Sequence, residues 1–272
     1  MTNDNAPKKH VPFAMQVLGE LYRSIYSKEN QMPNPDGVIF RDDITAELIK
    51  ASASDADIIW AARVSTQGAR SLEMVEANAG PSEGLINYLM RSRHGSPFEH
   101  SLFTFYIEIP IFVMRELARH RITSFNEASG RYKQLEPVFY NVSSERPLVQ
   151  TGKTGSYTFE RGDGWQYMIA VAEMRKQAAE AYASYKRMLD AGIAREVARD
   201  VLPVSIYTYL YMTINARSLM NMLSLRTNHP EARVPSSPLY EIALLGDRLE
   251  ELFAETMPMT HRAFVANGRV AP

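Results

Sequence analysis

A strictly alternating segment restricts the fold of this chain more than any other feature. From Ser101 to Ile109 the odd-numbered positions after the first are all apolar. Alternation with a period of two predicts a strand with one buried face. Pro110 follows directly and predicts the start of a helix, where its missing N–H is harmless. The chain should therefore contain a strand that leads straight into a helix, with Arg115 and Arg119 one turn apart on it.

The other patterns mix strands and helices without a regular rhythm. Further strands are expected at 43–51, 136–142 and 204–213, and helices at 54–63, 165–189, 194–201, 215–225 and 237–253. Polar and glycine-rich composition predicts loops at 124–130 and 151–164. Because there is neither a βαβ repeat nor a GxGxxG motif, a Rossmann cofactor site is not expected. We expect one α+β domain with a small, mostly antiparallel sheet flanked by helices.

The first 36 residues are expected to form an N-terminal extension, and residues 37–272 the main domain. Apolar side chains on one stripe predict a helix at 12–27. The proline- and glycine-containing run at 31–37 then interrupts the chain.

Composition excludes several classes of protein. No apolar run approaches the ~18 residues of a transmembrane helix, and the polar start lacks the apolar core of a secretory signal. The chain has no cysteine, which removes disulfides and thiolate zinc sites and fits a cytoplasmic protein. Its net charge of -1 provides no global positive field to attract nucleic acid.

Against this neutral background, one segment concentrates ligand-binding side chains. Residues 119–132 read RHRITSFNEASGRY, with three arginines, a histidine, several short polar side chains and one carboxylate. Arginine forks match phosphate oxygens bidentately, and hydroxyl and amide groups complete such sites. The segment therefore predicts an anion-binding site.

The same segment fits the pattern R-H-R-x-x-S-x-N-x-x-S-x-R-Y at every fixed position. This is the signature of flavin-dependent thymidylate synthases, which the chain resembles from about residue 43 to 226. The resemblance implies conversion of dUMP to dTMP by a homotetramer with sites at subunit junctions. Methylenetetrahydrofolate would give the carbon, and NADPH would reduce a bound FAD. The folate-only thymidylate synthases need a cysteine nucleophile, which this chain lacks, whereas a reduced flavin can deliver hydride without one.

The resemblance also assigns the FAD-binding residues. They would be His94, Ser96, Arg119, His120, Arg121, Glu127, Asn215, Arg217 and Asn221, with Ser65 as a weaker candidate. From the residues alone, 119–121 could equally be a solvated helix end, and Glu127 could pair with a neighbouring arginine. A metal site at His94 and His100 is not expected, because their spacing fits no common ligand pattern.

The residues implied for dUMP are Glu116, Arg119, Ser129, Gly130, Arg131, Arg199 and Arg226. Ser129 to Arg131 is typical of a phosphate clamp, and the resemblance implies that Arg199 comes from a neighbouring subunit. A salt-bridged surface helix would look the same around Arg199. Ser129 has no activating base near it in the sequence, so we expect it to bind and not to attack. Arg226 is the expected catalytic residue, because a cation beside uracil lowers the pKa of N3.

One position departs from the family pattern. The family usually has glutamine where this chain has Glu116. An ionised glutamate cannot donate a hydrogen bond and would repel a phosphate. Either Glu116 pairs with Arg115 or Arg119, or its substrate contact is lost.

Two other functions stay open at this point. One is a nucleic-acid-binding module that uses the arginines on a phosphate backbone, although the near-neutral charge argues against it. The other is a flavin-dependent uridine methyltransferase acting on RNA. That enzyme would need a basic track for RNA and usually a Rossmann-type FAD site, and neither is visible in the sequence.

Overall fold

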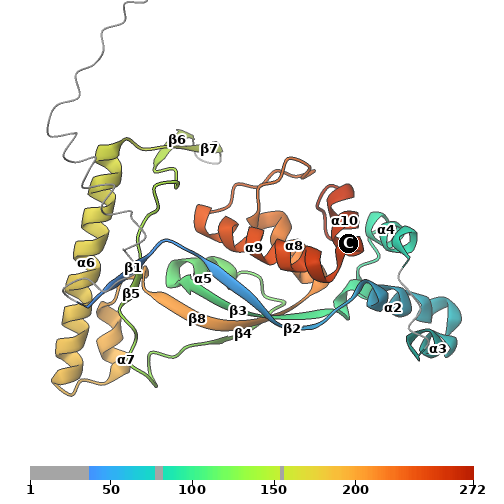
Figure 1. Cartoon of the computed structure of the whole chain (residues 1–272), viewed down its shortest axis with the longest axis horizontal. Helices are drawn as coiled ribbons and strands as arrows, with labels where there is room; N and C mark the ends of the chain where they lie inside the picture. The colour runs from blue at the N-terminus through green and yellow to red at the C-terminus, as the bar shows by residue number, and fades with distance from the viewer. Residues whose placement is uncertain (1–36, 77–81, 154–155) are drawn as a thin grey trace, which may run out of the picture. The chain divides into compact units, whose positions relative to one another are not determined.

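The computed structural model describes residues 37–76, 82–153 and 156–272 (Figure 1). The chain divides into two compact units. One consists of residues 37–42 and Gly130–Ile206, and the other of Asp43–Ser129 and Tyr207–Pro272. The helix predicted at 12–27 lies outside the described residues, so the N-terminal extension stays a prediction.

A four-stranded antiparallel sheet forms the centre of the unit that contains both Asp43–Ser129 and Tyr207–Pro272. Its order is β2-β3-β8-β4, with bounds Thr45–Ser52, Leu102–Pro110, Tyr207–Asn215 and Ser124–Glu127. Phe105 of β3 lies opposite Met212 of β8, and both side chains are fully buried. The alternation in β3 therefore has the predicted one-sided burial. The α+β class with a small antiparallel sheet flanked by helices is confirmed.

Helices cover one face of this sheet and build the core. Figure 1 shows α5 (Ile111–Leu117), α8 (Ala216–Arg226) and α9 (Tyr240–Thr256) on the same side of β2, β3 and β8. Their apolar side chains join those of the strands in one buried cluster. The same unit holds α2 (Asp55–Gln67), α3 (Arg70–Glu76), α4 (Glu83–Arg91), the 3₁₀ turn η2 (Ser96–Glu99) and α10 (Pro258–Ala266).

The other unit is built around a long helix, α6 (Gly164–Asp190). Its remaining elements are the parallel pair β1 (Ile39–Arg41) and β5 (Val138–Tyr140), the antiparallel pair β6 (Val149–Lys153) and β7 (Ser156–Glu160), α7 (Arg195–Ala198) and η3 (Arg199–Val201). The Tyr185 hydroxyl of α6 accepts a hydrogen bond from the Leu135 amide at 3.1 Å. This contact ties the chain after the arginine-rich signature to α6.

Four sequence predictions about elements were wrong. Residues 124–127 form β4 because their backbone pairs with the edge of β8, which outweighs their polar composition. The predicted loop at 151–164 contains β7 and part of β6. The helix after Pro110 ends at Leu117, since the amides of Arg119 and His120 make tighter three-residue turns, so Arg119 lies beyond it. The helix predicted at 237–253 is not the last one, because α10 follows α9 and starts at Pro258.

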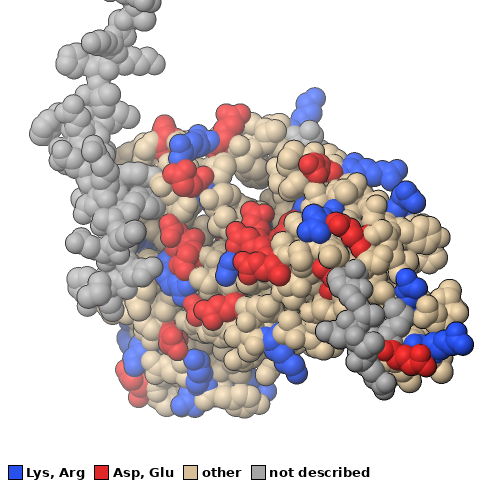
Figure 2. Space-filling model, turned by 45° about the vertical axis from the view of Figure 1, so that its right-hand side comes forward, with Lys and Arg blue, Asp and Glu red and all other residues tan. Residues whose placement is uncertain are grey.

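Acidic and basic side chains both occur across the face of the molecule shown in Figure 2, as the net charge of -1 suggests. Within the described ranges, no helix is both long and apolar enough to cross a membrane.

Candidate active site

The ends of α5 and α8 meet at a cluster of three predicted site residues, Glu116, His120 and Arg226. Arg226, the last residue of α8, donates from Nη1 to Oε2 of Glu116 at 2.7 Å. Its Nε donates to Nε2 of His120 at 3.1 Å. The Arg226 side chain is only 18% exposed, so the carboxylate of Glu116 supplies the counter-charge that a largely buried guanidinium needs. Glu116 thus pairs with Arg226, and not with Arg115 or Arg119 as the sequence suggested.

His120 is neutral in this cluster. Burial and the positive charge of Arg226 together lower the pKa of His120 from 6.5 to about 4, although the charge of Glu116 raises it in part. At pH 7 the ring therefore carries one proton.

The two arginines that flank His120 have a different environment. Arg119 and Arg121 are exposed, and among the described residues no side chain makes an ion pair or hydrogen bond with either guanidinium. Their charges have no internal counter-ion in this part of the chain. This donor set fits an anionic ligand, as FAD would be.

The predicted cofactor residues of α8 begin at its N-terminus. Asn215 caps the helix, and its Oδ1 accepts from the Ser218 amide at 2.8 Å. Arg217 forms an ion pair with Glu99 of η2 and donates from Nε to the Pro272 carbonyl at 2.7 Å. Asn221, one turn later, is exposed.

His94 lies between α4 and η2, Ser96 is the first residue of η2, and both are exposed. The His94 ring stacks on Tyr88 with the ring centroids 6.0 Å apart. Tyr88 was missed by the sequence analysis, because an exposed aromatic in a short amphipathic helix carries no signal of its own. Among the described residues, no group of three or more His, Cys, Asp or Glu side chains is placed to bind a metal. Ser65 is exposed and donates to the Ala62 carbonyl of its own helix.

Glu127 lies on β4 and accepts a hydrogen bond from the Thr208 hydroxyl at 2.6 Å. Thr208 belongs to the neighbouring strand β8. In the described part of the chain no arginine pairs with Glu127, so the ion pair considered from the sequence does not form there.

The phosphate-clamp residues lie in the unit of α6 from Gly130 onward. Gly130 is buried, and a Cβ built on it would lie 3.2 Å from Cδ of Arg199. Arg131 donates from Nε to Oε2 of Glu196 at 2.8 Å, and Glu196 is on the same short helix that leads to Arg199. Arg199 therefore lies beside Gly130 of its own chain, and its supply to the site by a neighbouring subunit stays a prediction.

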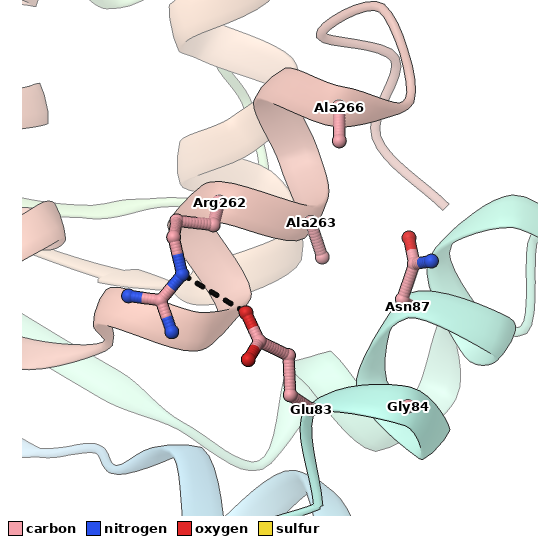
Figure 3. A pocket seen from close by; sticks show the side chains of 6 residues that line it. All are labelled: Glu83, Gly84, Asn87, Arg262, Ala263 and Ala266. Carbon is pink, nitrogen blue, oxygen red and sulfur yellow. Dashed lines mark hydrogen bonds and ion pairs between the residues drawn. The ribbon is translucent and has the colours of Figure 1, made fainter.

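A separate pocket of 270 Å³ lies between α4 and α10 (Figure 3). Arg262 pairs with Glu83 across it at 2.9 Å. None of the predicted site residues lines this pocket, and its two charges satisfy each other. We therefore place the candidate active site on the signature segment and not here.

Comparison with known proteins shows the family of this chain. The family model described as thymidylate synthase complementing protein matches residues 47–259. A flavin-dependent thymidylate synthase of Streptomyces coelicolor is 54% identical over 233 residues, which cover 85% of this chain and 95% of the relative. The enzyme of the same name from Tropheryma whipplei is 53% identical over 234 residues, 86% of this chain and 97% of the relative.

Solved structures agree as well. The UMP/dUMP methylase PolB from Streptomyces cacaoi, bound with 5-Br UMP, is 48% identical and superimposes with a TM-score of 0.80. The match covers 86% of this chain and all of that one. PolB bound with 5-Br dUMP gives a TM-score of 0.79. This chain belongs to the flavin-dependent thymidylate synthase family.

Proposed function

We propose that this protein methylates dUMP to dTMP, with methylenetetrahydrofolate as carbon donor and FAD reduced by NADPH. The observation that carries the proposal is the Arg226 cluster, in which a largely buried guanidinium is held between a carboxylate and a neutral imidazole. Such a preorganised cation can stabilise negative charge that develops on a pyrimidine. The nucleotide analogues bound to PolB support a free nucleotide, and not RNA, as the substrate.

FAD would be held mainly by residues at the ends of α5 and α8. Arg119 and Arg121 offer unpaired charges, and Arg217 adds a third guanidinium beside the backbone of Gly95. When bound and reduced, the flavin supplies the hydride. Ser96, Asn215 and the other predicted contacts would orient it.

The phosphate of dUMP would be held by Arg131 and Arg199, together with Ser129 and the backbone of Gly130. Glu196 already places a carboxylate against Arg131. An anion therefore fits this guanidinium, and a phosphate would compete with Glu196 for it. Gly130 permits the close approach, since a side chain there would press on Arg199 and Leu135.

Arg226 would activate the uracil ring. A positive charge beside a uracil carbonyl stabilises the ring after loss of its N3 proton, and this electron-rich ring attacks the one-carbon unit. No protein nucleophile is required, which suits a chain without cysteine. The protein is proposed to act as a cytoplasmic homotetramer with its sites at subunit junctions.

UMP is a second candidate substrate. The specific observation is that PolB is described as a methylase of both UMP and dUMP. The residues described here bind phosphate and base, and these groups are common to the two nucleotides.

The test is the visible absorption spectrum of the purified protein, followed by turnover assays. We expect flavin absorption that changes when dUMP is added, and formation of dTMP with methylenetetrahydrofolate and NADPH. Parallel assays with UMP measure the preference between the sugars. A colourless protein that stays inactive after addition of FAD would overturn the proposal.

A further inference from the structure

The hydrogen bond between Arg226 and His120 fixes where the imidazole proton lies. A guanidinium only donates hydrogen bonds and has no acceptor. Nε2 of His120, 3.1 Å from Nε of Arg226, must therefore present its lone pair. In a neutral ring the one proton then sits on Nδ1. A second proton on Nε2 would break this hydrogen bond and place two positive charges side by side.

Glu116 binds Arg226, which in turn binds His120. Its Oε2 accepts from Nη1 of Arg226 at 2.7 Å, and its backbone carbonyl lies 3.4 Å from Nη2. The carboxylate is thus engaged on the face of α5 that meets the end of α8. It balances the charge of Arg226 and directs the Nε–H of that residue to His120.

We propose that Glu116 is a positioning residue that holds Arg226, and that Arg226 in turn fixes His120 as the neutral tautomer protonated at Nδ1. His120 then offers one N–H donor and no charge. Its ligand would be a neutral acceptor, namely a ring carbonyl or ring nitrogen, and not a phosphate. The low pKa of His120 agrees with this state, since burial and Arg226 both disfavour the imidazolium. The inference rests on the proposed function only for the measurement of kcat with dUMP.

The tautomer can be read directly by solid-state ¹⁵N NMR of the full-length protein labelled at its six histidines. The His120 signals are assigned by their loss in His120→Asn. At pH 7 we expect a protonated Nδ1 and a bare Nε2. Arg226→Ala should give a mixture of both tautomers and a higher pKa. A proton on Nε2 of His120 in the unaltered protein would overturn the inference.

Separate additions of FAD and of dUMP show which of the two ligands carries the ring atom that accepts the Nδ1–H of His120. The ligand that His120 contacts should shift its Nδ1 signal. If neither shifts it, His120 does not recognise a ring acceptor and that part of the proposal is wrong.

Glu116→Ala tests the positioning role in the holoenzyme, because alanine removes the acceptor of the Arg226 hydrogen bond, whereas glutamine, the usual residue of the family, would still accept it. A hydrogen bond with a charged partner is typically worth ~1.5–3 kcal/mol, so the kcat at saturating dUMP should fall about ten- to hundredfold. The Kd for dUMP should change little, and the His120 tautomers should mix. Arg115→Ala, at an exposed neighbour on α5, is the matched control and should change none of these.

A loss of dUMP affinity as large as the loss of kcat, with an unchanged His120 spectrum, would make Glu116 a direct ligand. The ¹⁵N NMR spectrum of His120 can be recorded on a protein that does not turn over. A protein that fails to methylate dUMP would therefore refute the proposed function while leaving the tautomer measurement decisive.

Discussion

Gly95 lies directly against the guanidinium of Arg217: a Cβ built on this glycine would sit 2.5 Å from Cζ of the arginine. Arg217 is held there by Glu99 and by the Pro272 carbonyl. The neighbour that a methyl group would meet is the end of a flexible side chain. The fold can therefore tolerate Gly95→Ala, but Arg217 would have to leave its position.

Gly95→Ala should consequently release flavin in the same way as Arg217→Ala. We expect both variants to lose bound flavin on gel filtration while keeping a cooperative thermal transition. Gly84→Ala is the matched control, because a Cβ at Gly84 meets nothing within 4 Å. Full flavin retention by Gly95→Ala and Arg217→Ala would show that Arg217 does not bind the cofactor.

Arg131→Ala and Arg199→Ala should each weaken dUMP binding. A charge-assisted contact is typically worth ~1.5–3 kcal/mol, which corresponds to about ten- to hundredfold in Kd. The measurement is equilibrium binding of dUMP to the holoenzyme. Arg161→Ala is the control, since it removes another exposed ion pair of the same unit, with Glu145.

Mixed oligomers of these two variants distinguish how the clamp is assembled. If a neighbouring subunit supplies Arg199, combining Arg131→Ala with Arg199→Ala subunits should restore part of the activity, since some sites then carry neither substitution. No rescue in verified mixed oligomers would show that both arginines of a site come from one chain, in which Gly130 lies beside Arg199.

Glu250 should make stability depend on pH in the acid range. Its carboxylate accepts hydrogen bonds from the buried Arg269 and from His261. Burial raises the pKa of Glu250, but these hydrogen bonds and charges outweigh it and bring the pKa from 4.5 to about 2. The folded state thus binds the proton more weakly than the unfolded chain. The stabilisation is complete above pH 4.5 and is lost as pH falls toward 2.

Glu250→Gln removes that contribution and leaves Arg269, 1% exposed, without its counter-charge. Breaking a buried ion pair costs roughly 3–5 kcal/mol, so the free energy of unfolding at pH 7 should fall by about that amount. Urea unfolding at several pH values should show the gap to the unaltered protein closing between pH 4.5 and 2. Glu251→Gln, in an exposed pair with Arg248, should cost less than about 1 kcal/mol. Parallel pH curves for Glu250→Gln and the unaltered protein would contradict the assignment.

Local patterns predicted those elements whose burial is one-sided. The alternation in β3 and the capping residues Ser54 and Asn215 each encode their structure within a few positions. β4 could not be predicted in this way. It has a single apolar side chain turned toward the core, Phe125, and becomes a strand only because β8 offers an edge.

The chemistry of the signature was predictable, but its internal partners were not. Glu116 and Arg226 are 110 positions apart, so the sequence offered only the neighbouring arginines as partners for the carboxylate. Likewise, Arg199 contacts Gly130 through the fold of one unit, which spacing along the chain does not reveal. Long-range pairing needs the tertiary structure.

Arg226 should activate the uracil ring, whereas Ser129 should only bind the nucleotide. Lysine keeps the positive charge but cannot make the forked contacts with Glu116 and His120 together. Arg226→Lys should therefore retain part of the turnover, and Arg226→Ala very little. Ser129→Ala should raise the KM for dUMP and leave kcat nearly intact, because the clamp holds a group that does not react. The measurement is tritium release from 5-tritiated dUMP at saturating substrate. If Ser129→Ala is inactive at saturation while Arg226→Ala turns over normally, the two roles are reversed and the uracil ring is attacked by the serine.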